Sequence, residues 1–208
     1  MPQPNFDLYL ITDRKLAPGR NLCAVVEQAL DGGVRAIQLR EKDLGGKELF
    51  ELADKISALC RRYNAQLFIN ERIDVALAVD AAGVQLGKTS IPIGIARALL
   101  GANKSIGYSA HTLKEARVAA LDGADFLLFG PVYFTPSKAP YGAPQGLTVL
   151  REIVDKVAVP VYAIGGIKTE NLAETIKTGV RGVALISAVM SAADPVRAAK
   201  SILTMLAR

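Results

Sequence analysis

The sequence contains few of the residues on which several protein classes depend. Among 208 residues there are two cysteines, one histidine and no tryptophan, and aromatic residues make up only 6%. Cys23 and Cys60 stand far apart and form no CxxC pair, which argues against a disulfide framework and a structural zinc site. Both fall in helical stretches, where we expect them to be packing residues.

Long apolar runs are missing as well. None approaches the roughly 18 residues that a membrane-spanning helix needs. Residues 1–5, MPQPN, have neither the basic start nor the apolar core of a signal peptide. We therefore expect a cytoplasmic protein with no membrane association.

Basic residues exceed acidic ones, 25 to 20, which gives a net charge of +5. They are scattered along the chain, and no run of adjacent basic residues is longer than a pair such as Arg61-Arg62. Nucleic-acid binders usually gather such an excess into a stripe and add aromatic residues for base stacking. We expect an anionic small molecule as partner rather than a nucleic acid.

A short apolar run alternates with an amphipathic stretch from one end of the chain to the other. Half of the residues are hydrophobic and 22% are charged, as in a folded globular domain. The apolar runs that predict strands cover 6–12, 36–41, 66–70, 83–87, 105–111, 126–132, 160–166 and 182–188. The stretches with helical spacing cover 21–31, 47–63, 72–80, 91–100, 113–122, 147–157, 170–178 and 194–206.

This alternation predicts parallel βαβ units. Strands that are apolar throughout are typical of sheets covered on both faces. Eight such units favour an α/β fold of the (β/α)8 TIM-barrel type, with residues 1–208 as a single domain. A doubly wound open sheet is the alternative.

In such a barrel the functional site lies at the carboxyl ends of the strands. Polar and charged residues follow the predicted strands at these positions: Thr12, Asp13, Arg40, Glu41, Lys42, Asn70, Glu71, Arg72, Lys88, Ser109, His111, Thr112 and Ser187. Each one alone could cap a helix or lie in a solvated loop. Together the cations predict a site for an anion.

The loops after the seventh and eighth strands indicate a phosphate. Gly165-Gly166 follows the seventh, and Ile186-Ser187 ends the eighth. Barrel enzymes often bind phosphate at these two loops through backbone N–H groups and a helix N-terminus. Glycine pairs are also common in ordinary turns, so a plain turn is the alternative.

Residues 130–146 form a long loop, GPVYFTPSKAPYGAPQG, rich in proline and glycine. Most βα connections have 2–6 residues, and longer ones are often binding loops or lids. Thr135, Ser137 and Lys138 offer two hydroxyls and a cation for a phosphate or pyrophosphate. A rigid surface loop is the alternative.

His111, the single histidine, is the residue best suited to general acid–base chemistry near neutral pH. It could instead cap the helix that begins after Thr112. Glu41 and Glu71 are the candidate carboxylates. Because Glu41 stands between Arg40 and Lys42, an ion pair that orients those cations is as good an expectation as a chemical role.

Six stretches in this order resemble the thiamin-phosphate synthase/TenI family, and the resemblance covers essentially the whole chain. The stretches are IQLREK (37–42), INERIDVALAVDAAGVQLG (69–87), YSAHT (108–112), GADFLLFGPVYFTPSK (123–138), VYAIGGI (161–167) and GVALISA (182–188). The resemblance implies a barrel enzyme of thiamin biosynthesis. The synthases join a pyrimidine pyrophosphate to a thiazole phosphate with Mg²⁺ and release pyrophosphate.

Carried over by position, the resemblance implies a role for several residues. Gln38, Arg40 and Lys42 would contact the pyrimidine and its pyrophosphate, and Asn70 and Ser109 would add further contacts. The loop residues Thr135, Ser137 and Lys138 match a phosphate-binding motif of the family. The cradle for the thiazole phosphate would comprise Gly166, Ile186 and Ser187.

The chain departs from the synthase pattern at the expected Mg²⁺ ligands. Synthases usually have aspartates at the positions of Glu71 and Ser90, and the residue before Thr89 is the cation Lys88. Mg²⁺ is usually bound by one or two carboxylates plus phosphate oxygens. Glu71 is thus the candidate metal ligand if the protein is a synthase.

TenI-type members lack the same aspartates, and one of their activities is thiazole tautomerisation. That proton relocation needs an acid–base, here His111, and a phosphate anchor but no metal. We favour this tautomerase hypothesis, with no cofactor. The alternatives are an Mg²⁺-dependent synthase and a non-catalytic binder or regulator. The expected partners are thiazole phosphate, with pyrimidine pyrophosphate for the synthase, and a second copy of the chain in a homo-oligomer.

Overall fold

A computed structural model describes residues 4–136 and 142–207. In this part of the chain, eight parallel strands pair in sequence order and close into a barrel. They are β1 (Leu8–Ile11), β2 (Ala36–Leu39), β3 (Gln66–Asn70), β4 (Gly83–Leu86), β5 (Ser105–Ala110), β6 (Phe126–Phe129), β7 (Val161–Ile164) and β8 (Gly182–Leu185). The predicted (β/α)8 fold is confirmed, and the doubly wound alternative is excluded.

Helices alternate with these strands. They are α1 (Leu22–Asp31), α2 (Gly46–Arg62), α3 (Ile73–Ala78), α4 (Ile93–Leu100), α5 (Leu113–Leu121), α6 (Gly146–Lys156), α7 (Thr169–Ile176), α8 (Ser187–Met190) and α9 (Pro195–Leu206). The predicted helical stretches match α1–α7 and α9. The short helices η1 (Arg14–Leu16) and α8 were not predicted, because three or four residues show no helical periodicity.

Two compact groups of residues can be described separately. Unit 1 comprises Met1–Asp7 and Leu86–Ala184, and unit 2 comprises Leu8–Gln85 and Leu185–Arg208. The single domain over residues 1–208 stays a prediction.

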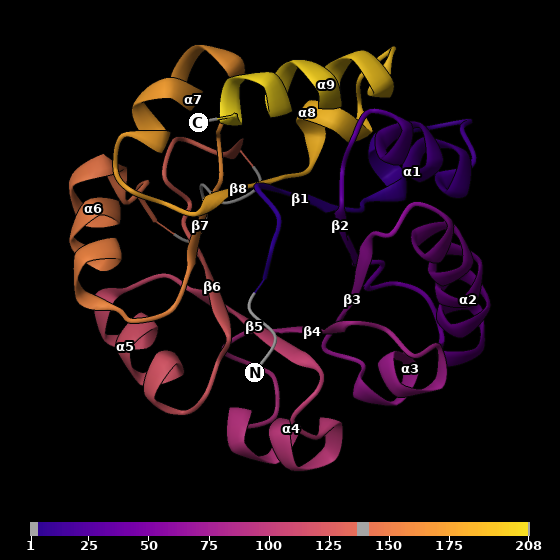
Figure 1. Ribbon diagram of the computed structural model, residues 1–208, viewed down its shortest axis with the longest axis horizontal. Helices are drawn as coiled ribbons and strands as arrows, with labels where there is room; N and C mark the ends of the chain where they lie inside the picture. Colours follow the sequence, from indigo (N-terminus) through magenta and orange to yellow (C-terminus); the bar gives the residue numbers. More distant parts are fainter. Residues whose placement is uncertain (1–3, 137–141, 208) are drawn as a thin grey trace. The chain divides into compact units, whose positions relative to one another are not determined.

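Unit 2 contains β1–β3 with α1, α2 and α3 along one face of these strands, and α9 packed against α1 (Figure 1). The register places Gln38 beside Ile11 and Phe68, and Asn70 beside Gln85. The strands are buried along nearly their whole length, as their apolar sequences predict. This register fixes where each strand ends and therefore where the polar residues that follow it begin.

Unit 1 contains β5, β6 and β7, which pair in register from Gly107↔Phe126 to Phe129↔Ala163. Its core includes a cluster of three aromatic rings. The ring of Phe6 stacks on Tyr162 at 4.8 Å, and both meet Phe126 edge-on. The hydroxyl of Tyr162 donates to the carbonyl of Phe6 at 2.9 Å, so Phe6 is held in the core of this unit by its backbone as well as by its ring.

Over the described residues, no helix has the length and apolarity required to cross a membrane. Both cysteines are free thiols, and Cys60 is buried.

Candidate active site

The end of β2 presents alternating polar residues. Gln38 is 1% exposed, and its Nε2 has no hydrogen-bond partner among the described residues. A buried amide without a partner is costly and indicates a site that a ligand completes. Arg40 follows directly after the strand and is partly exposed, and Lys42 is exposed.

Glu41 does not form the ion pair with Arg40 or Lys42 that we expected. Its carboxylate turns toward the end of β1, where it accepts from the Thr12 hydroxyl at 2.8 Å and from Arg14 Nη1 at 3.0 Å. The expectation was wrong because Arg14, 27 positions away in the chain, lies closer in space than the charged neighbours in sequence. The carboxylate is buried, so its charge requires these donors.

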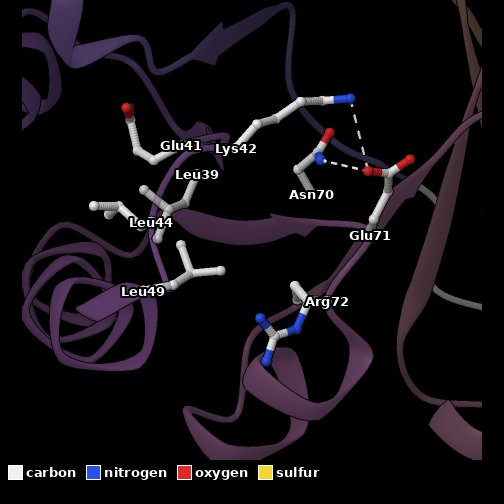
Figure 2. A pocket seen from close by; sticks show the side chains of 8 residues that line it. All are labelled: Leu39, Glu41, Lys42, Leu44, Leu49, Asn70, Glu71 and Arg72. Carbon is white, nitrogen blue, oxygen red and sulfur yellow. Dashed lines mark hydrogen bonds and ion pairs between the residues drawn. The ribbon is translucent and has the colours of Figure 1, made fainter. Parts of the chain in front are cut away.

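Asn70 and Glu71 end β3 beside Lys42. The Glu71 Oε2 accepts from Asn70 Nδ2 at 3.2 Å and lies 3.7 Å from Lys42 Nζ (Figure 2). Glu71 has φ of 60°, a left-handed conformation that L-residues rarely adopt. Its backbone N–H donates to the Gln85 carbonyl at 3.0 Å, which holds this turn against β4. Strained backbone of this kind is concentrated at functional sites.

These residues form one side of a pocket of about 200 Å³. Figure 2 shows Lys42, Asn70 and Glu71 converging on one side, with leucines on the other. The lining residues are Leu39, Glu41, Lys42, Leu44, Leu49, Asn70, Glu71 and Arg72. The sequence analysis placed Arg72 with Asn70 and Glu71 after the third strand, and it missed the lining residues Leu39, Leu44 and Leu49, which are apolar.

A metal at this pocket would depend on Glu71. Within residues 4–136 and 142–207, no group of three or more histidine, cysteine, aspartate or glutamate side chains could hold a metal ion. A single carboxylate beside an amide is still a workable donor set for Mg²⁺, which takes its remaining ligands from substrate phosphates and water. Ser90 accepts a hydrogen bond from the Gly87 N–H at 2.9 Å and so stabilises the turn after β4.

His111, in unit 1, follows β5 and is exposed. Its Nδ1 lies 2.5 Å from the Gly130 carbonyl oxygen, which can only accept. Nδ1 therefore bears the hydrogen, and in the neutral ring Nε2 is the basic atom. The helix-cap alternative for His111 is wrong, because the Thr112 hydroxyl caps α5 by accepting from the Glu115 N–H.

Gly165 and Gly166 follow β7 with φ of 96° and 66°. A side chain at either position would collide with the segment after β6: a Cβ would lie 2.6 Å from Pro131 or from the Phe134 carbonyl oxygen. Glycine is required here by both space and backbone conformation. A Cβ on Gly165 would also meet Thr135 Oγ1 at 3.2 Å, so Thr135 lies close to the glycine pair.

Two residues that the sequence analysis missed support this loop. The Asn171 side chain donates to the Gly166 carbonyl at 3.0 Å and accepts from the Lys168 N–H. The Tyr133 hydroxyl donates to Glu174 on α7 at 2.8 Å. Asn171 could have been found from the sequence, because it is a polar residue in the first turn of the helix that follows the glycine pair.

The remaining predicted residues have the following positions. Ile186 and Ser187 lie at the start of the four-residue helix α8. Ser109 is half-buried in β5. Ser137 and Lys138 lie outside the described residues.

Comparison with known proteins identifies the family. The chain matches the family described as thiamine monophosphate synthase over residues 8–189. The chain belongs to this family. A member from Geobacter sulfurreducens is 50% identical, with 99% of this chain and 97% of the relative covered. The thiamine-phosphate synthase of Moorella thermoacetica is 45% identical, with 99% and 98% covered.

The structure also resembles a solved member of the family. It matches the thiamine phosphate pyrophosphorylase from Pyrococcus furiosus with a TM-score of 0.88 and 43% identity, covering 97% of this chain and 95% of that chain. This thiamine monophosphate synthase family member is therefore an enzyme of the thiamin pathway. The names of its relatives favour the synthase alternative over the tautomerase that we preferred from the sequence.

Proposed function

We propose that this protein is a thiamine-phosphate synthase, which joins hydroxymethylpyrimidine pyrophosphate to thiazole phosphate and releases pyrophosphate. The observation that supports it most is the convergence of Lys42 and Asn70 on the Glu71 carboxylate at one pocket. Relatives named as synthases are 43% and 45% identical over nearly the whole chain.

Arg40 and Lys42 would bind the pyrophosphate group. As the bond to the pyrimidine methylene breaks, the leaving pyrophosphate gains negative charge. Cations already in place stabilise that charge more than they stabilise the bound substrate, and this difference lowers the barrier. Lys138, on the loop after β6, is a further candidate for this work.

Gln38 would orient the pyrimidine. Its buried Nε2 is a donor without a partner among the described residues, and a pyrimidine ring nitrogen is an acceptor of matching size. A site that hydrogen-bonds its substrate in this way discriminates strongly against analogues that lack the acceptor.

Glu71 would hold the Mg²⁺ ion. When bound, the ion would act as a Lewis acid toward the phosphate oxygens. Lys42 and Asn70 keep the Glu71 carboxylate at the pocket and oriented by their contacts with Oε2. This residue replaces the aspartate usual at its position with a side chain one methylene longer.

The second substrate would bind through backbone groups. The phosphate of the thiazole would lie against Gly165 and Gly166, beside the Thr135 hydroxyl. Left-handed glycines turn successive N–H groups toward one point, a geometry that binds anions. Ser109 would add a contact to the pyrimidine or its pyrophosphate.

The coupling itself requires no proton transfer. The thiazole nitrogen supplies a lone pair to the pyrimidine methylene, and pyrophosphate leaves with the electrons of the broken bond. His111 would therefore help to bind or orient substrate in a synthase, whereas a tautomerase would need it as the acid–base. Replacing His111 with alanine separates the two hypotheses.

The test mixes the purified protein with both substrates and Mg²⁺ and detects thiamin phosphate by its oxidation to a fluorescent thiochrome. We expect product at an enzymatic rate, and a fall of about tenfold or less for His111→Ala. No product from folded protein that binds thiazole phosphate would overturn the proposal. A thiazole proton-relocation assay would then identify a tautomerase by a loss of at least about 100-fold in His111→Ala.

A further inference from the structure

We propose that Glu41 is a positioning residue that directs Arg40 and Lys42 toward the pyrophosphate. The proposal rests on the proposed function, in which these two cations bind that group. In this role Glu41 would not itself bind the substrate. It acts through a hydrogen-bond network that fixes the chain on either side of it.

Glu41 is anchored in a buried site at the end of β1. Its side chain is 2% exposed, and donors from two residues surround it. Oε1 accepts from the Thr12 hydroxyl at 2.8 Å and from the Arg14 N–H at 3.1 Å, and Oε2 accepts from Arg14 Nη1 at 3.0 Å. A carboxylate that accepts several charge-assisted or backbone hydrogen bonds has little freedom to move.

Thr12 transmits this anchor to Arg40. Its hydroxyl donates to Glu41 and also accepts from the Arg40 N–H at 3.0 Å. Since one oxygen does both, its hydrogen is fixed on the Glu41 side and its lone pair on the Arg40 side. The backbone at Arg40 is thereby tied to β1 as well as to its own strand.

Arg14 also holds Asp43, the residue that follows Lys42. Its guanidinium also binds Asp43 through two nitrogens, at 2.7 and 3.0 Å. Glu41 and Asp43, the two neighbours of Lys42, are thus held by the same arginine. Figure 2 shows the result, with Glu41 turned away from Lys42 and the Lys42 side chain extended toward Glu71.

The test measures the Michaelis constant for each substrate separately. Glu41→Gln replaces one acceptor oxygen with a donor that faces other donors, and Thr12→Val removes the hydroxyl at nearly constant volume. We expect each to raise KM for the pyrimidine pyrophosphate about tenfold and to leave KM for thiazole phosphate within about twofold. Thr12→Ser, which keeps the hydroxyl, should restore the wild-type value.

Asn21→Ala is the matched control for lost stability. Asn21 caps α1 by accepting from the Cys23 N–H and lies in the same β1–α1 connection as Arg14, but its side-chain hydrogen bond is to α1 and not to Thr12, Arg14 or Glu41. It should lower the melting temperature and leave both KM values unchanged. The double variant with Thr12→Val and Glu41→Gln should have a KM for the pyrimidine pyrophosphate less than about twofold above that of the worse single variant, because both substitutions break the same network.

Equal changes in both KM values, or a loss of active protein with no change in either, would overturn the positioning role. If Glu41→Gln does not fold, Thr12→Val and Thr12→Ser decide alone. If the wild type forms no thiamin phosphate, the proposed function fails, and titration with inorganic pyrophosphate by calorimetry replaces the KM measurement. About tenfold weaker pyrophosphate binding in Thr12→Val would then uphold the positioning role, and equal binding or none in the wild type would refute it.

Discussion

Gln38 shows at the scale of one residue how binding and stability can oppose each other. Its amide is buried at the end of β2 with Nε2 unpaired among the described residues, an arrangement that costs about 1–3 kcal/mol. A protein with no use for the amide would be more stable with an apolar side chain of the same length.

Gln38→Met should therefore raise the free energy of unfolding by about 1 kcal/mol and lower the rate of thiamin phosphate formation by more than about tenfold. Urea denaturation and the thiochrome assay measure the two effects. Gln66→Met is the matched control, because Gln66 Oε1 is also buried and has no hydrogen-bond partner in the described part of the chain, but lies at the opposite end of its strand. It should gain stability with full activity, and a fully active Gln38→Met would refute the pyrimidine role.

Because of Cys60, the free energy of unfolding should depend on pH in the alkaline range. Burial raises the pKa of its thiol from 9.0 to about 12. A raised folded-state pKa gives stability that is complete below pH 9 and is lost as the pH rises toward 12, because only the unfolded chain can ionise the thiol.

Unfolding measurements should show a loss of about 1 kcal/mol between pH 9 and pH 10 that is absent in Cys60→Ala. Cys23→Ala is the comparison, since that thiol is only half-buried and its pKa is raised less by burial. If the free energy of unfolding falls equally between pH 9 and pH 10 in the wild type and in Cys60→Ala, other titrating groups cause the pH dependence.

At the scale of elements, the sequence predicts strands and helices because burial sets their composition. The runs at 66–70 and 105–111 match β3 and β5 within one residue, as expected for strands apolar on both faces. The run at 126–132 overshoots β6 by three residues, because Pro131-Val132 continues the apolar sequence where pairing has ended. Helix α8 has too few residues to show a period.

Glycine positions within elements lead to a further prediction. A Cβ on Gly182, the first residue of β8, would lie 2.1 Å from the Asp7 carbonyl oxygen. The nearest atoms are all backbone atoms of Asp7, with no flexible side chain among them that could move aside. Gly182→Ala should therefore destabilise the protein by about 3 kcal/mol or more.

Gly94 is the matched control for that substitution. It lies in α4 with open space around its Cα, and Gly94→Ala should raise stability by up to about 1 kcal/mol through helix propensity. Chemical denaturation of both variants gives the comparison. Equal stabilities would contradict the close approach at β8.

At the scale of the whole molecule, topology is what made the candidate site predictable. Parallel strands in sequence order place the residues after each strand at its carboxyl end, so Arg40, Asn70 and His111 could be chosen without coordinates. The directions in which the side chains point could not be predicted, because they depend on contacts between segments distant in sequence. The contact from Thr12 to Glu41 spans 29 positions, and no local pattern records it.

The residues of the site alone also do not decide between the tautomerase and the synthase reactions. A histidine with a basic Nε2 and a glycine cradle suit both a proton relocation and a coupling. Similarity over nearly the full chain to named synthases favours the coupling. The central claim is then that Glu71 performs the metal-binding role with one carboxylate.

The most direct test is the rate of thiamin phosphate formation against Mg²⁺ concentration for the wild type and Glu71→Gln. We expect the wild-type rate to rise with Mg²⁺ and to stop with EDTA. The maximal rate of the variant should be about 100-fold lower, and the variant should need more Mg²⁺ to reach half of that rate. The reason is that one carboxylate–metal interaction is worth several kcal/mol. A full rate in EDTA, or a Glu71→Gln variant with the wild-type Mg²⁺ dependence, would contradict the account.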